Sequence, residues 1–330
     1  MTGPDHLEAD RLSAPGGQPV LVVDAATWRR QDVPIQAVVI GVDREGVLPV
    51  TAPDDFDMML TAASCSPSPW VSLDAEHFGV AVERLTEAVR KNPQASTIAA
   101  AVLRLTAALP LADALTIESF AYSALLGGAD FARWRRENDS GSPWPSPAAP
   151  LLIERDGDRI TLTLNNPANR NAMTAPMRDA LYEALANALD DPSRPTVRLQ
   201  GAGKCFSTGG DLTEFGTAHD LAEAHLVRTL HSCARALDAL GERAEVRLHG
   251  ACVGSGIEVT AAAHRRIAAI DSWFQLPELT MGLIPGAGGT ATVARAIGRH
   301  RTMWMLLSAR RVGAAQALDW GLVDAIDDER

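Results

Sequence analysis

The sequence predicts an α/β protein in two parts, a smaller N-terminal part in which strands precede helices and a larger C-terminal part in which they alternate. Three observations support this prediction. Short β-branched runs at 19–25 and 36–43 are followed by helical apolar spacing from 73 to 137. A stretch rich in Pro and Ser occupies 138–150. After residue 151, predicted strands end in glycine-rich turns, which is where α/β folds bind ligands.

These changes of pattern divide the 330 residues into four segments. We expect a disordered lead over 1–17, because this segment is rich in Gly, Pro and Asp and has few apolar anchors. An N-terminal domain follows over 18–137, with short strands first and then helices over 73–137. A linker over 138–150 leads to the larger α/β domain over 151–330.

The composition disfavours several classes of function. The net charge of −11 argues against nucleic acid or an anionic membrane surface as the main partner. No apolar run approaches the roughly 18 residues of a membrane span, and the polar N-terminus is unlike a secretory signal. The four cysteines lack the paired spacing of a metal site, so we expect reduced thiols, no metal and a cytoplasmic location.

The N-terminal part is predicted to contain strands and then a run of helices. The strands are the apolar runs at 19–25, 36–43 and 57–63. The helical segments have apolar spacing near 3.6 and end at proline or glycine. They are expected at 78–92, 96–109, 112–128 and 131–138.

The C-terminal part is predicted to begin with a hairpin at 151–167 that turns at Asp156-Gly157. An amphipathic helix at 174–192 follows, with Thr174 as its N-cap. The pattern then predicts a strand at 196–203, one long helix at about 218–240, and a strand over AEVRLHGACVG at 244–254.

Three turns of small residues stand out: KCFSTGGDL (204–212), GACVGSGIEV (250–259) and GLIPGAGGT (282–290). Glycine lets a ligand approach the backbone closely, and two N–H groups from different turns can stabilise a developing oxyanion. The alternative is that these turns only pack helices against a sheet. The third turn lacks the full pattern of a dinucleotide or phosphate loop, which disfavours nucleotide binding.

Two carboxylates lie in apolar surroundings close to these turns. Glu258 follows the Gly254-Ser255-Gly256 turn, and Glu278 follows Pro277. Carboxylates are rarely buried without a reason, and two of them facing one pocket can move protons to and from water and carbon. The alternative is a helix-capping glutamate and a separate loop ion pair. Sequence spacing alone leaves both interpretations open.

These motifs together resemble the crotonase superfamily and, within it, the enoyl-CoA hydratase/isomerase family. The resemblance rests on FSTGGDLTEF, HGACVGSGIEVTAAAHRRIAA and FQLPELTMGLIPGAGGT, with NNPANRNAM before them and RRVGAAQALDWGLVDAI after them. It covers about 151–326, and the motifs occur in the family's order and at similar spacing. It implies a crotonase-like ββα spiral core over 151–330, preceded by an atypical N-terminal extension.

The resemblance also implies roles for particular residues. The backbone N–H groups of Gly210 and Ser255 match the family's oxyanion hole, and Glu258 and Glu278 match its two catalytic glutamates. The residues expected to contact substrate or CoA are Ala168, Arg170, Ala172, Thr208, Asp211, Leu212, Gly254 and Pro277. Asp211 with Glu214 also fits an N-cap pair at a helix start. No cofactor is implied beyond the coenzyme A of the substrate.

The implied activity is that of an enoyl-CoA hydratase, which adds water across the C2=C3 bond of a 2-enoyl-CoA thioester. Retention of both glutamates favours a hydratase over an isomerase, because isomerisation often needs only one acid/base group. Other crotonase-type reactions remain open, namely isomerisation, dehydration, decarboxylation and oxygenation of an aryl-acetyl-CoA. A non-catalytic acyl-CoA-binding subunit is a further alternative.

The sequence departs from the family at both ends. Family members usually continue with C-terminal helices that cover the acyl pocket and help to build a trimer, and such helices are not seen after the GLVD motif. Our hypothesis is that the helices over 73–137 provide this cover, in cis or from a neighbouring subunit. We expect a homo-oligomer, a trimer or hexamer, with an acyl-CoA substrate and no nucleic-acid or membrane partner.

Overall fold

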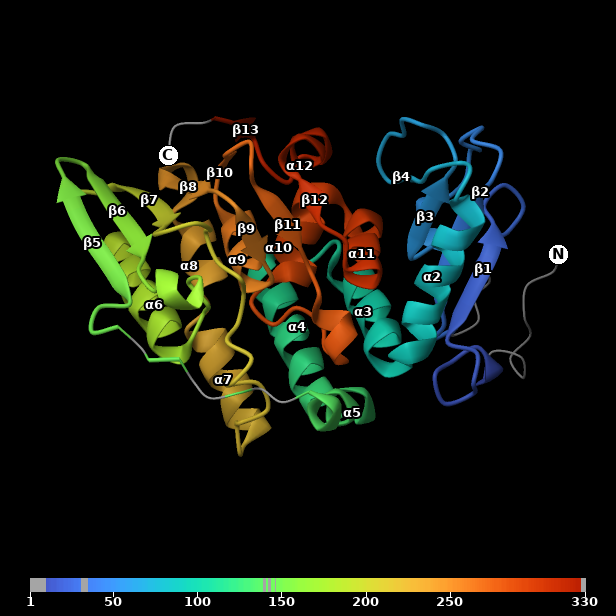
Figure 1. The fold of residues 1–330 in the computed structure, drawn as a ribbon, viewed down its shortest axis with the longest axis horizontal. Coiled ribbons are helices and arrows are strands. Elements are labelled where there is room, and N and C mark those ends of the chain that lie inside the picture. Colours follow the sequence, from blue (N-terminus) through green and yellow to red (C-terminus); the bar gives the residue numbers. More distant parts are fainter. Residues whose placement is uncertain (1–9, 31–34, 139–140, 142–143, 146, 328–330) are drawn as a thin grey trace.

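A computed structural model describes residues 10–30, 35–138, 141, 144–145 and 147–327. A small sheet lies at one end of the molecule and the β5–β6 hairpin lies at the other, with helices and two further sheets between them (Figure 1). The α/β class predicted from the sequence is therefore correct. The predicted linker over 138–150 contains no helix or strand among its described residues.

The small sheet is parallel throughout, with its strands in chain order. Its strands are β1 (Val20–Asp24), β2 (Val38–Asp43), β3 (Met58–Thr61) and β4 (Val71–Ser72), and the 3₁₀ turn η1 (Pro53–Asp55) precedes β3. The disorder predicted for residues 1–17 is wrong for residues 10–17, the part of this segment that the structure describes. Leu12 is buried, and its carbonyl accepts hydrogen bonds from the N–H groups of Gln36 and Ala37.

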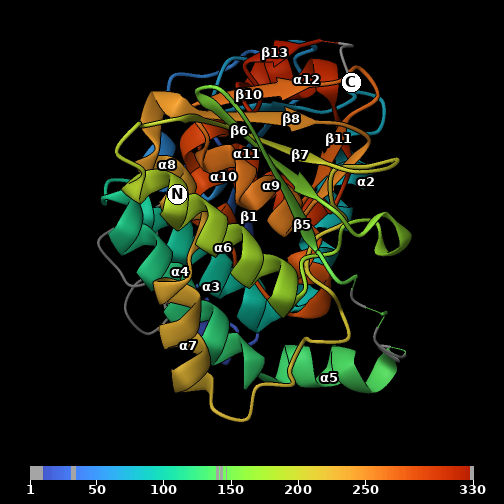
Figure 2. The same cartoon turned by 90° about the vertical axis from the view of Figure 1, so that its left-hand side faces the viewer.

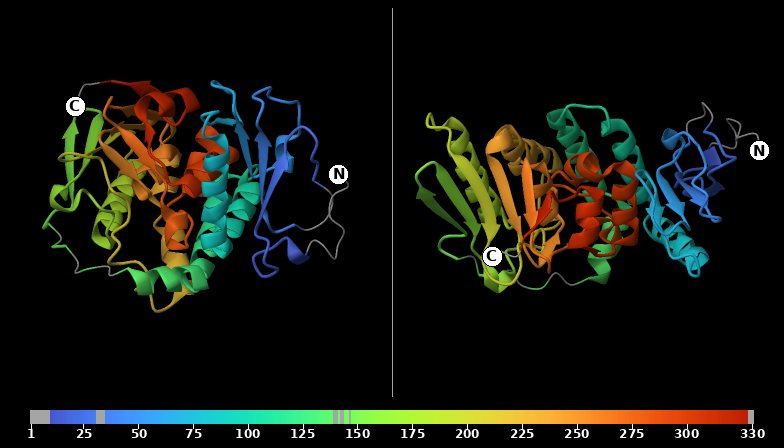
Figure 3. Two further views of the ribbon diagram at one scale, coloured as in Figure 1. Left: turned by 45° about the vertical axis from the view of Figure 1, so that its right-hand side comes forward. Right: turned by 90° about the horizontal axis from the view of Figure 1, so that it is seen from above.

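Four helices follow the small sheet, close to the predicted positions. They are α2 (Phe78–Lys91), α3 (Pro93–Thr106), α4 (Leu111–Leu126) and α5 (Ala129–Glu137). Helix α3 begins earlier than predicted because Pro93 lies in its first turn, where a missing N–H costs no hydrogen bond. Helices α2 and α3 pack against β1 and β2 of the small sheet, and α11 (Arg299–Ser308) packs against β3, on the side of the sheet that faces the rest of the molecule (Figure 3).

The C-terminal part contains a six-stranded sheet and a three-stranded sheet. The order of the larger sheet is β13-β10-β8-β7-β6-β5, and that of the smaller sheet is β12-β11-β9. The larger sheet comprises β5 (Leu151–Asp156), β6 (Arg159–Leu164), β7 (Thr196–Gly201), β8 (Ala244–Leu248), β10 (Arg265–Ala268) and β13 (Ala325–Ile326). The smaller sheet comprises β9 (Ala251–Val253), β11 (Trp273–Gln275) and β12 (Val312–Gly313).

The single strand predicted over 244–254 is in fact two strands in different sheets, β8 and β9. The chain turns between them at Gly250, which has a φ of 55°. A Cβ atom at this position would lie 2.5 Å from the Lys204 carbonyl oxygen, so only glycine fits. The turn moves the GACVGSGIEV segment out of the larger sheet and toward the other glycine-rich turns.

The helices of the C-terminal part pack around these sheets. They are α6 (Ala175–Asp190), α7 (Leu221–Leu230), α8 (Cys233–Ala239), α9 (Ser255–Glu258), α10 (Gly289–Ile297), α11 and α12 (Ala314–Trp320). The 3₁₀ turns are η2 (Pro167–Asn169), η3 (Gly241–Arg243), η4 (Thr260–Ala262) and η5 (Glu278–Met281). Helix α6 lies beside the β5–β6 hairpin (Figure 2), and Thr174 caps it as predicted by accepting from the Met177 N–H.

The long helix predicted at 218–240 is divided into α7 and α8. Asp220 caps α7 by accepting from the N–H groups of Ala222 and Glu223. Ser232 caps α8 by accepting from the Arg235 N–H. The apolar spacing is continuous across the break, so the second cap residue is the signal that the sequence interpretation passed over.

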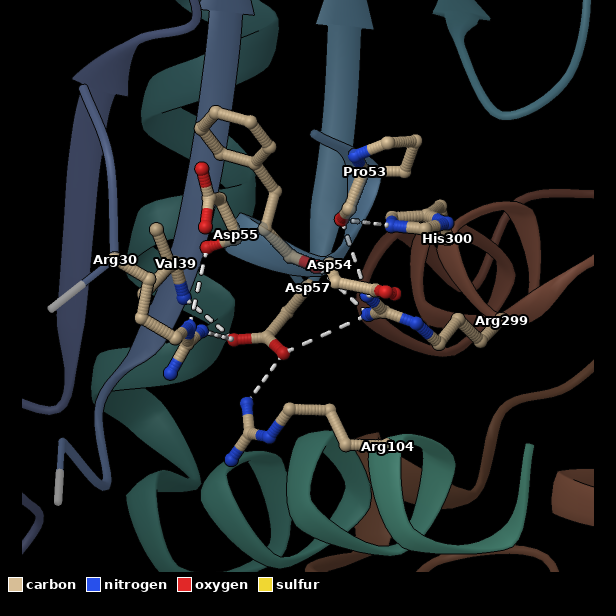
Figure 4. Close-up of polar contacts among 10 residues, drawn as sticks. Arg30, Val39, Pro53, Asp54, Asp55, Asp57, Arg104, Arg299 and His300 are labelled. Atoms are coloured by element: carbon tan, nitrogen blue, oxygen red, sulfur yellow. Dashed lines mark hydrogen bonds and ion pairs between the residues drawn. The ribbon is translucent and has the colours of Figure 1, made fainter. Parts of the chain in front are cut away.

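A buried charge cluster joins the small sheet to the helices beside it (Figure 4). Asp57 is 2% exposed and forms ion pairs with Arg30, Arg104 and Arg299, which come from three different segments. The carboxylate of Asp57 also accepts a 2.8 Å hydrogen bond from the Val39 N–H. The cluster ties β2 and β3 to α3 and α11 through a carboxylate whose charge is fully compensated.

Candidate active site

Two of the three predicted glycine turns lie directly against each other. The Ser207 N–H donates to the Ala251 carbonyl, and the Val253 N–H donates to the Ser207 carbonyl. Gly209 has a φ of 90°, and a Cβ atom there would lie 2.9 Å from the Val253 carbonyl oxygen. The close approach of the two backbones therefore requires a residue without a side chain.

The two predicted oxyanion-hole residues follow directly after these contacts. Gly210 comes after Gly209, and Ser255 is the first residue of the short helix α9. Within the described part of the chain, neither backbone N–H donates to a protein acceptor. The Ser255 hydroxyl is buried and also has no partner among the described residues. Unused donors on two neighbouring turns are what stabilisation of a developing oxyanion requires.

Glu258 is buried beside these turns at the end of α9, with a residue exposure of 2%. One of its carboxylate oxygens accepts from the Ala287 N–H at 2.7 Å and from the Gly289 N–H at 3.2 Å. Its backbone carbonyl accepts from the Thr292 hydroxyl at 2.6 Å. The third glycine turn therefore holds the Glu258 carboxylate in place, while its second oxygen is directed toward Gly254.

Glu278 reaches the same point from η5. A Cβ atom on Gly254 would lie 2.8 Å from one Glu278 carboxylate oxygen and 3.7 Å from the nearer Glu258 oxygen. The other Glu278 oxygen is buried and has no hydrogen-bond partner among the described residues. Gly254 has a φ of 49° and a ψ of −125°, so the turn itself also requires glycine. The two glutamates, 20 residues apart in sequence, thus meet above one turn.

A third buried carboxylate, Glu118 of α4, lies behind this pair. It accepts from the Gly288 N–H at 2.7 Å, from the Thr290 N–H at 2.7 Å and from the Thr290 hydroxyl at 2.6 Å. Glu118 and Glu258 therefore hold the same GAGGT turn from two sides. The helix that contributes Glu118 belongs to the N-terminal part of the chain.

The three carboxyl groups have raised pKa values because they are buried close to one another. Burial raises the pKa of Glu258 to about 7, although its hydrogen bonds from Ala287 and Gly289 act in the opposite direction. Burial, followed by repulsion from Glu258, raises the pKa of Glu278 well above its usual range. The same two causes raise the pKa of Glu118 to about 8. Near neutral pH, Glu278 therefore keeps its proton while Glu258 is poised to ionise.

Further residues of the N-terminal helices pack against the site loops. The ring of Tyr122 in α4 lies against Gly286, where an added Cβ atom would approach it to 2.8 Å. A Cβ atom added to Gly282 would lie 2.5 Å from the Asp130 carbonyl carbon and 2.6 Å from the Phe131 nitrogen, both in α5. Arg135 donates to the Phe215 carbonyl at 2.7 Å. This is the placement that our hypothesis of an N-terminal cover requires, within a single chain.

The predicted CoA-contacting loop folds back onto the first glycine turn. Arg170 has a φ of 50°, and its carbonyl accepts from the Thr208 N–H. Ala168 and Arg170 are exposed, whereas Ala172 is buried. Asn171, which the sequence interpretation missed, holds this loop: its side chain bonds the backbone at 166, 202, 205 and 206.

The remaining predicted contact residues differ in how far they are exposed. Pro277 is partly buried next to Glu278, and Leu212 is 45% exposed. The predicted cap pair of Asp211 and Glu214 is wrong, because no helix begins there. Asp211 instead accepts from the Thr213 N–H and hydroxyl, and from the Asn169 side chain at 3.0 Å. The Glu214 carboxylate accepts from the Ala175 N–H at the start of α6.

Glu118 was missed because its partners are about 170 residues away in sequence. One signal was present, since LADALTIESFAYSALL is apolar on nearly every face and carries a single glutamate near its middle. A carboxylate in the middle of such a helix, unlike the exposed Asp113 in its first turn, needs buried hydrogen-bond donors. In the described residues no helix is long and apolar enough to cross a membrane. No group of three or more metal-ligating side chains was found in the same part of the chain.

Comparison with known proteins identifies the family. Residues 156–330 match the family model for enoyl-CoA hydratase/isomerase. The match covers more than half of the chain, and the chain therefore belongs to the enoyl-CoA hydratase/isomerase family.

Individual relatives agree with this assignment. The chain is 33% identical to the 2,3-dehydroadipyl-CoA hydratase of Escherichia coli over 53% of its own length and 68% of the relative's. It is 31% identical to a probable enoyl-CoA hydratase of Bacillus subtilis, over 49% of its own length and 63% of the relative's. With the peroxisomal bifunctional enzyme of Danio rerio it shares 33% identity, but it spans only 24% of that protein.

Solved structures show the same fold for the C-terminal part. The enoyl-CoA hydratase of Thermoplasma volcanium superposes with a TM-score of 0.51 and 29% identity, covering 55% of this chain and 73% of that one. An enoyl-CoA hydratase/carnithine racemase of Magnetospirillum magneticum superposes with a TM-score of 0.51 and 27% identity. The superposition covers 56% of this chain and 70% of that one. The predicted crotonase-like core is confirmed.

Proposed function

We propose that this protein is an enoyl-CoA hydratase that adds water across the C2=C3 bond of a 2-enoyl-CoA thioester. The observation that carries the proposal is the convergence of Glu258 and Glu278 on Gly254, beside two turns with unused N–H donors. The names of the Escherichia coli and Bacillus subtilis relatives describe this same class of reaction. The chain spans less than two thirds of the length of several relatives that it matches.

The two glutamates take different roles in this proposal because their pKa values differ. Glu258, whose pKa is raised to about 7, ionises near neutral pH and removes a proton from the attacking water. Glu278, whose pKa lies well above its usual range, keeps its proton and donates it to C2. The hydroxide equivalent adds to C3, so the net change is the addition of one water molecule.

The two glycine turns stabilise the charge that develops during this addition. As water adds at C3, the thioester oxygen becomes an enolate oxygen, and the N–H groups of Gly210 and Ser255 donate to it. One such donor in a dry site is worth roughly 3 kcal/mol of barrier. Helices α4 and α5 would exclude bulk water from this region, which strengthens the interaction.

Turnover of 2-enoyl-CoA esters by the wild type, Glu258→Gln and Glu278→Gln tests the proposal. We expect the wild type to form a product one water heavier than the substrate, and each variant to lose about 10²–10⁴-fold in kcat. The Gln side chains keep the shape of the site but cannot transfer the proton. The exposed Glu242→Gln is the matched control and should retain full activity.

A wild-type product of unchanged mass would assign the site to isomerisation and overturn the hydratase proposal. Tight binding of the esters without any turnover would support the non-catalytic alternative instead. We further propose that the enzyme needs no metal or redox cofactor, with coenzyme A present only as part of the substrate. The homotrimer or hexamer stays a prediction, and light scattering after size-exclusion chromatography measures the molar mass that tests it. The cytoplasmic location also stays a prediction.

A further inference from the structure

A pocket of about 90 Å³ is lined by residues of α4, α7 and α8 and by the Gly286–Gly288 turn, which holds Glu258. Its lining also includes Met173, whose N–H donates to the Gly209 carbonyl. Arg228 and Arg235 belong to the same lining. The pocket therefore lies next to the turn that holds Glu258 and contains a pair of arginines.

Arg228 is held firmly by the N-terminal helix α4. One of its terminal nitrogens donates to the Ser119 hydroxyl at 2.8 Å and to the Ser123 hydroxyl at 3.1 Å. Its guanidinium group stacks over the Tyr122 ring at 4.6 Å from the ring centre. These contacts fix the position of the guanidinium and leave its other nitrogens available.

The charge of Arg228 is not compensated by an ion pair. In the described part of the chain no carboxylate lies within ion-pair distance of it, whereas Arg178 in the same pocket is paired with Asp179 at 2.8 Å. Glu118 also lines the pocket, but both of its carboxylate oxygens are occupied by Gly288 and Thr290. A half-buried, fixed and unpaired guanidinium in a pocket is suited to bind an anion.

Building on the proposed function, we propose that Arg228 binds a carboxylate at the far end of the acyl chain. The preferred substrate is then the mono-CoA thioester of an unsaturated dicarboxylic acid. The part of the pocket beside Met173 and the Gly286–Gly288 turn would contain the hydrocarbon part of the chain. The terminal carboxylate would accept from the free guanidinium nitrogens of Arg228.

The anion could also come from a phosphate of coenzyme A, and the two sources differ in what they predict. A phosphate is present in every CoA ester, so loss of Arg228 would weaken all esters equally. An acyl carboxylate is present in only one member of a matched pair. The thioesters of 2-hexenoic acid and 2-hexenedioic acid form such a pair, because they differ only at the chain end.

The experiment compares kcat/KM for these two esters with the wild type, Arg228→Met and Arg235→Met. We expect the wild type to prefer the 2-hexenedioyl ester. Arg228→Met should lose about 100-fold on that ester and change little on 2-hexenoyl-CoA, since it loses a charge-assisted hydrogen bond to the chain end. Arg235→Met, at the exposed rim of the same pocket, should lose much less on either ester.

Calorimetric titration with the saturated adipoyl-CoA and hexanoyl-CoA gives a readout that does not depend on turnover. Tighter binding of adipoyl-CoA by the wild type is expected, even if the protein hydrates neither unsaturated ester. In that case the hydratase proposal fails while the carboxylate proposal stands. Equal affinity for the two saturated esters overturns the carboxylate proposal, whatever the catalytic result.

Two further results would overturn the carboxylate proposal. One is an equal loss on both esters in Arg228→Met, which would assign the arginine to coenzyme A. The other is a wild-type preference for 2-hexenoyl-CoA. Arg228 also holds Ser119 and Ser123, so Arg228→Lys is included as a milder change, and thermal unfolding of each variant is measured. Arg228→Lys keeps a charge and should retain part of the preference.

Discussion

Two of the regions that bury carboxylates in this molecule do so in opposite ways. Asp57 lies among three arginines and accepts a backbone hydrogen bond, so its charge is compensated. Glu118, Glu258 and Glu278 are buried together, and none of them forms an ion pair with a described residue. The first region holds two parts of the chain together. The second has the raised pKa values expected of acid/base chemistry.

The contrast shows what each arrangement contributes. A paired buried carboxylate fixes a geometry, and removing it leaves buried cations without a partner. Unpaired carboxylates destabilise the fold when they ionise, and they are retained where proton transfer needs them. Substitution of the two kinds of carboxylate should therefore affect different properties, stability in one region and activity in the other.

The largest expected effect on stability is that of Asp57→Asn. We expect it to lower the free energy of unfolding by about 3–5 kcal/mol, because the arginines around it lose their compensating charge. Denaturant unfolding measures this change. Asp54→Asn is the control: Asp54 is fully exposed in its ion pair with Arg299, so its loss should change stability by about 0.5 kcal/mol or less. Equal effects of the two variants would contradict the assigned role of Asp57.

The unpaired carboxylates should make stability depend on pH in a particular direction. Between pH 4.5 and about 8, Glu118 keeps its proton in the folded state and loses it in the unfolded state. The unfolded state then binds fewer protons, so stability should fall as pH rises through this range.

Glu118→Gln should reduce this pH-dependent loss of stability. At pH 8 the reduction in the loss of unfolding free energy should be on the order of 1 kcal/mol or more, since each pKa unit corresponds to about 1.4 kcal/mol. Thermal unfolding at several pH values between 5 and 8 measures it. The variant keeps one oxygen acceptor but places an amide N–H₂ group beside the Gly288 and Thr290 donors. This loss of a hydrogen bond lowers stability at every pH and opposes the stabilisation expected at pH 8. A slope that is unchanged in Glu118→Gln would show that other groups produce it.

The rate of hydration should also depend on pH, with a rising limb near pH 7. The proposed base, Glu258, must be ionised, and its pKa is raised to about 7. The proposed acid, Glu278, must stay protonated, so activity should fall again at higher pH. Glu118 keeps its proton up to about pH 8, so Glu118→Gln replaces a neutral group near pH 7 and should leave the rising limb where it is. A rising limb of kcat/KM that moves to lower pH by about one unit in this variant would show that Glu118 carries a charge next to Glu258.

The smallest effect is expected for Ser255→Ala. The hydroxyl is buried without a partner, so its removal should leave stability unchanged or raise it by about 1 kcal/mol. The backbone N–H of residue 255 is retained, and kcat should change less than tenfold. A loss of several hundredfold would show that the hydroxyl itself binds the substrate.

The sequence predicted the parts of the fold that depend on local pattern. Strand–helix alternation, the Thr174 cap and the two glycine turns are encoded within short segments, and the structure contains them. The family resemblance identified Glu258 and Glu278 as candidates. Local pattern could not distinguish one helix from two at 218–240, because apolar spacing continues through Ser232.

The rest of the site depends on contacts between distant segments. Glu118 meets Gly288 across 170 residues of sequence, and Arg228 is held by Ser119 across 109. No periodicity within either segment indicates such a pairing. The burial of Asp57 is equally hidden, because PDDFD has the composition of an exposed turn. These long-range contacts are what bring the N-terminal helices to the proposed active site.

The most direct test of the central claim follows the atoms of water into the product. The wild type, Glu258→Gln and Glu278→Gln are incubated with 2-hexenoyl-CoA in water enriched in heavy oxygen and deuterium. If the buried, unpaired glutamates carry out hydration, the wild-type product has heavy oxygen at C3 and deuterium at C2, and both variants form almost none. A wild-type product that contains no heavy oxygen, or full activity in both variants, would contradict the claim.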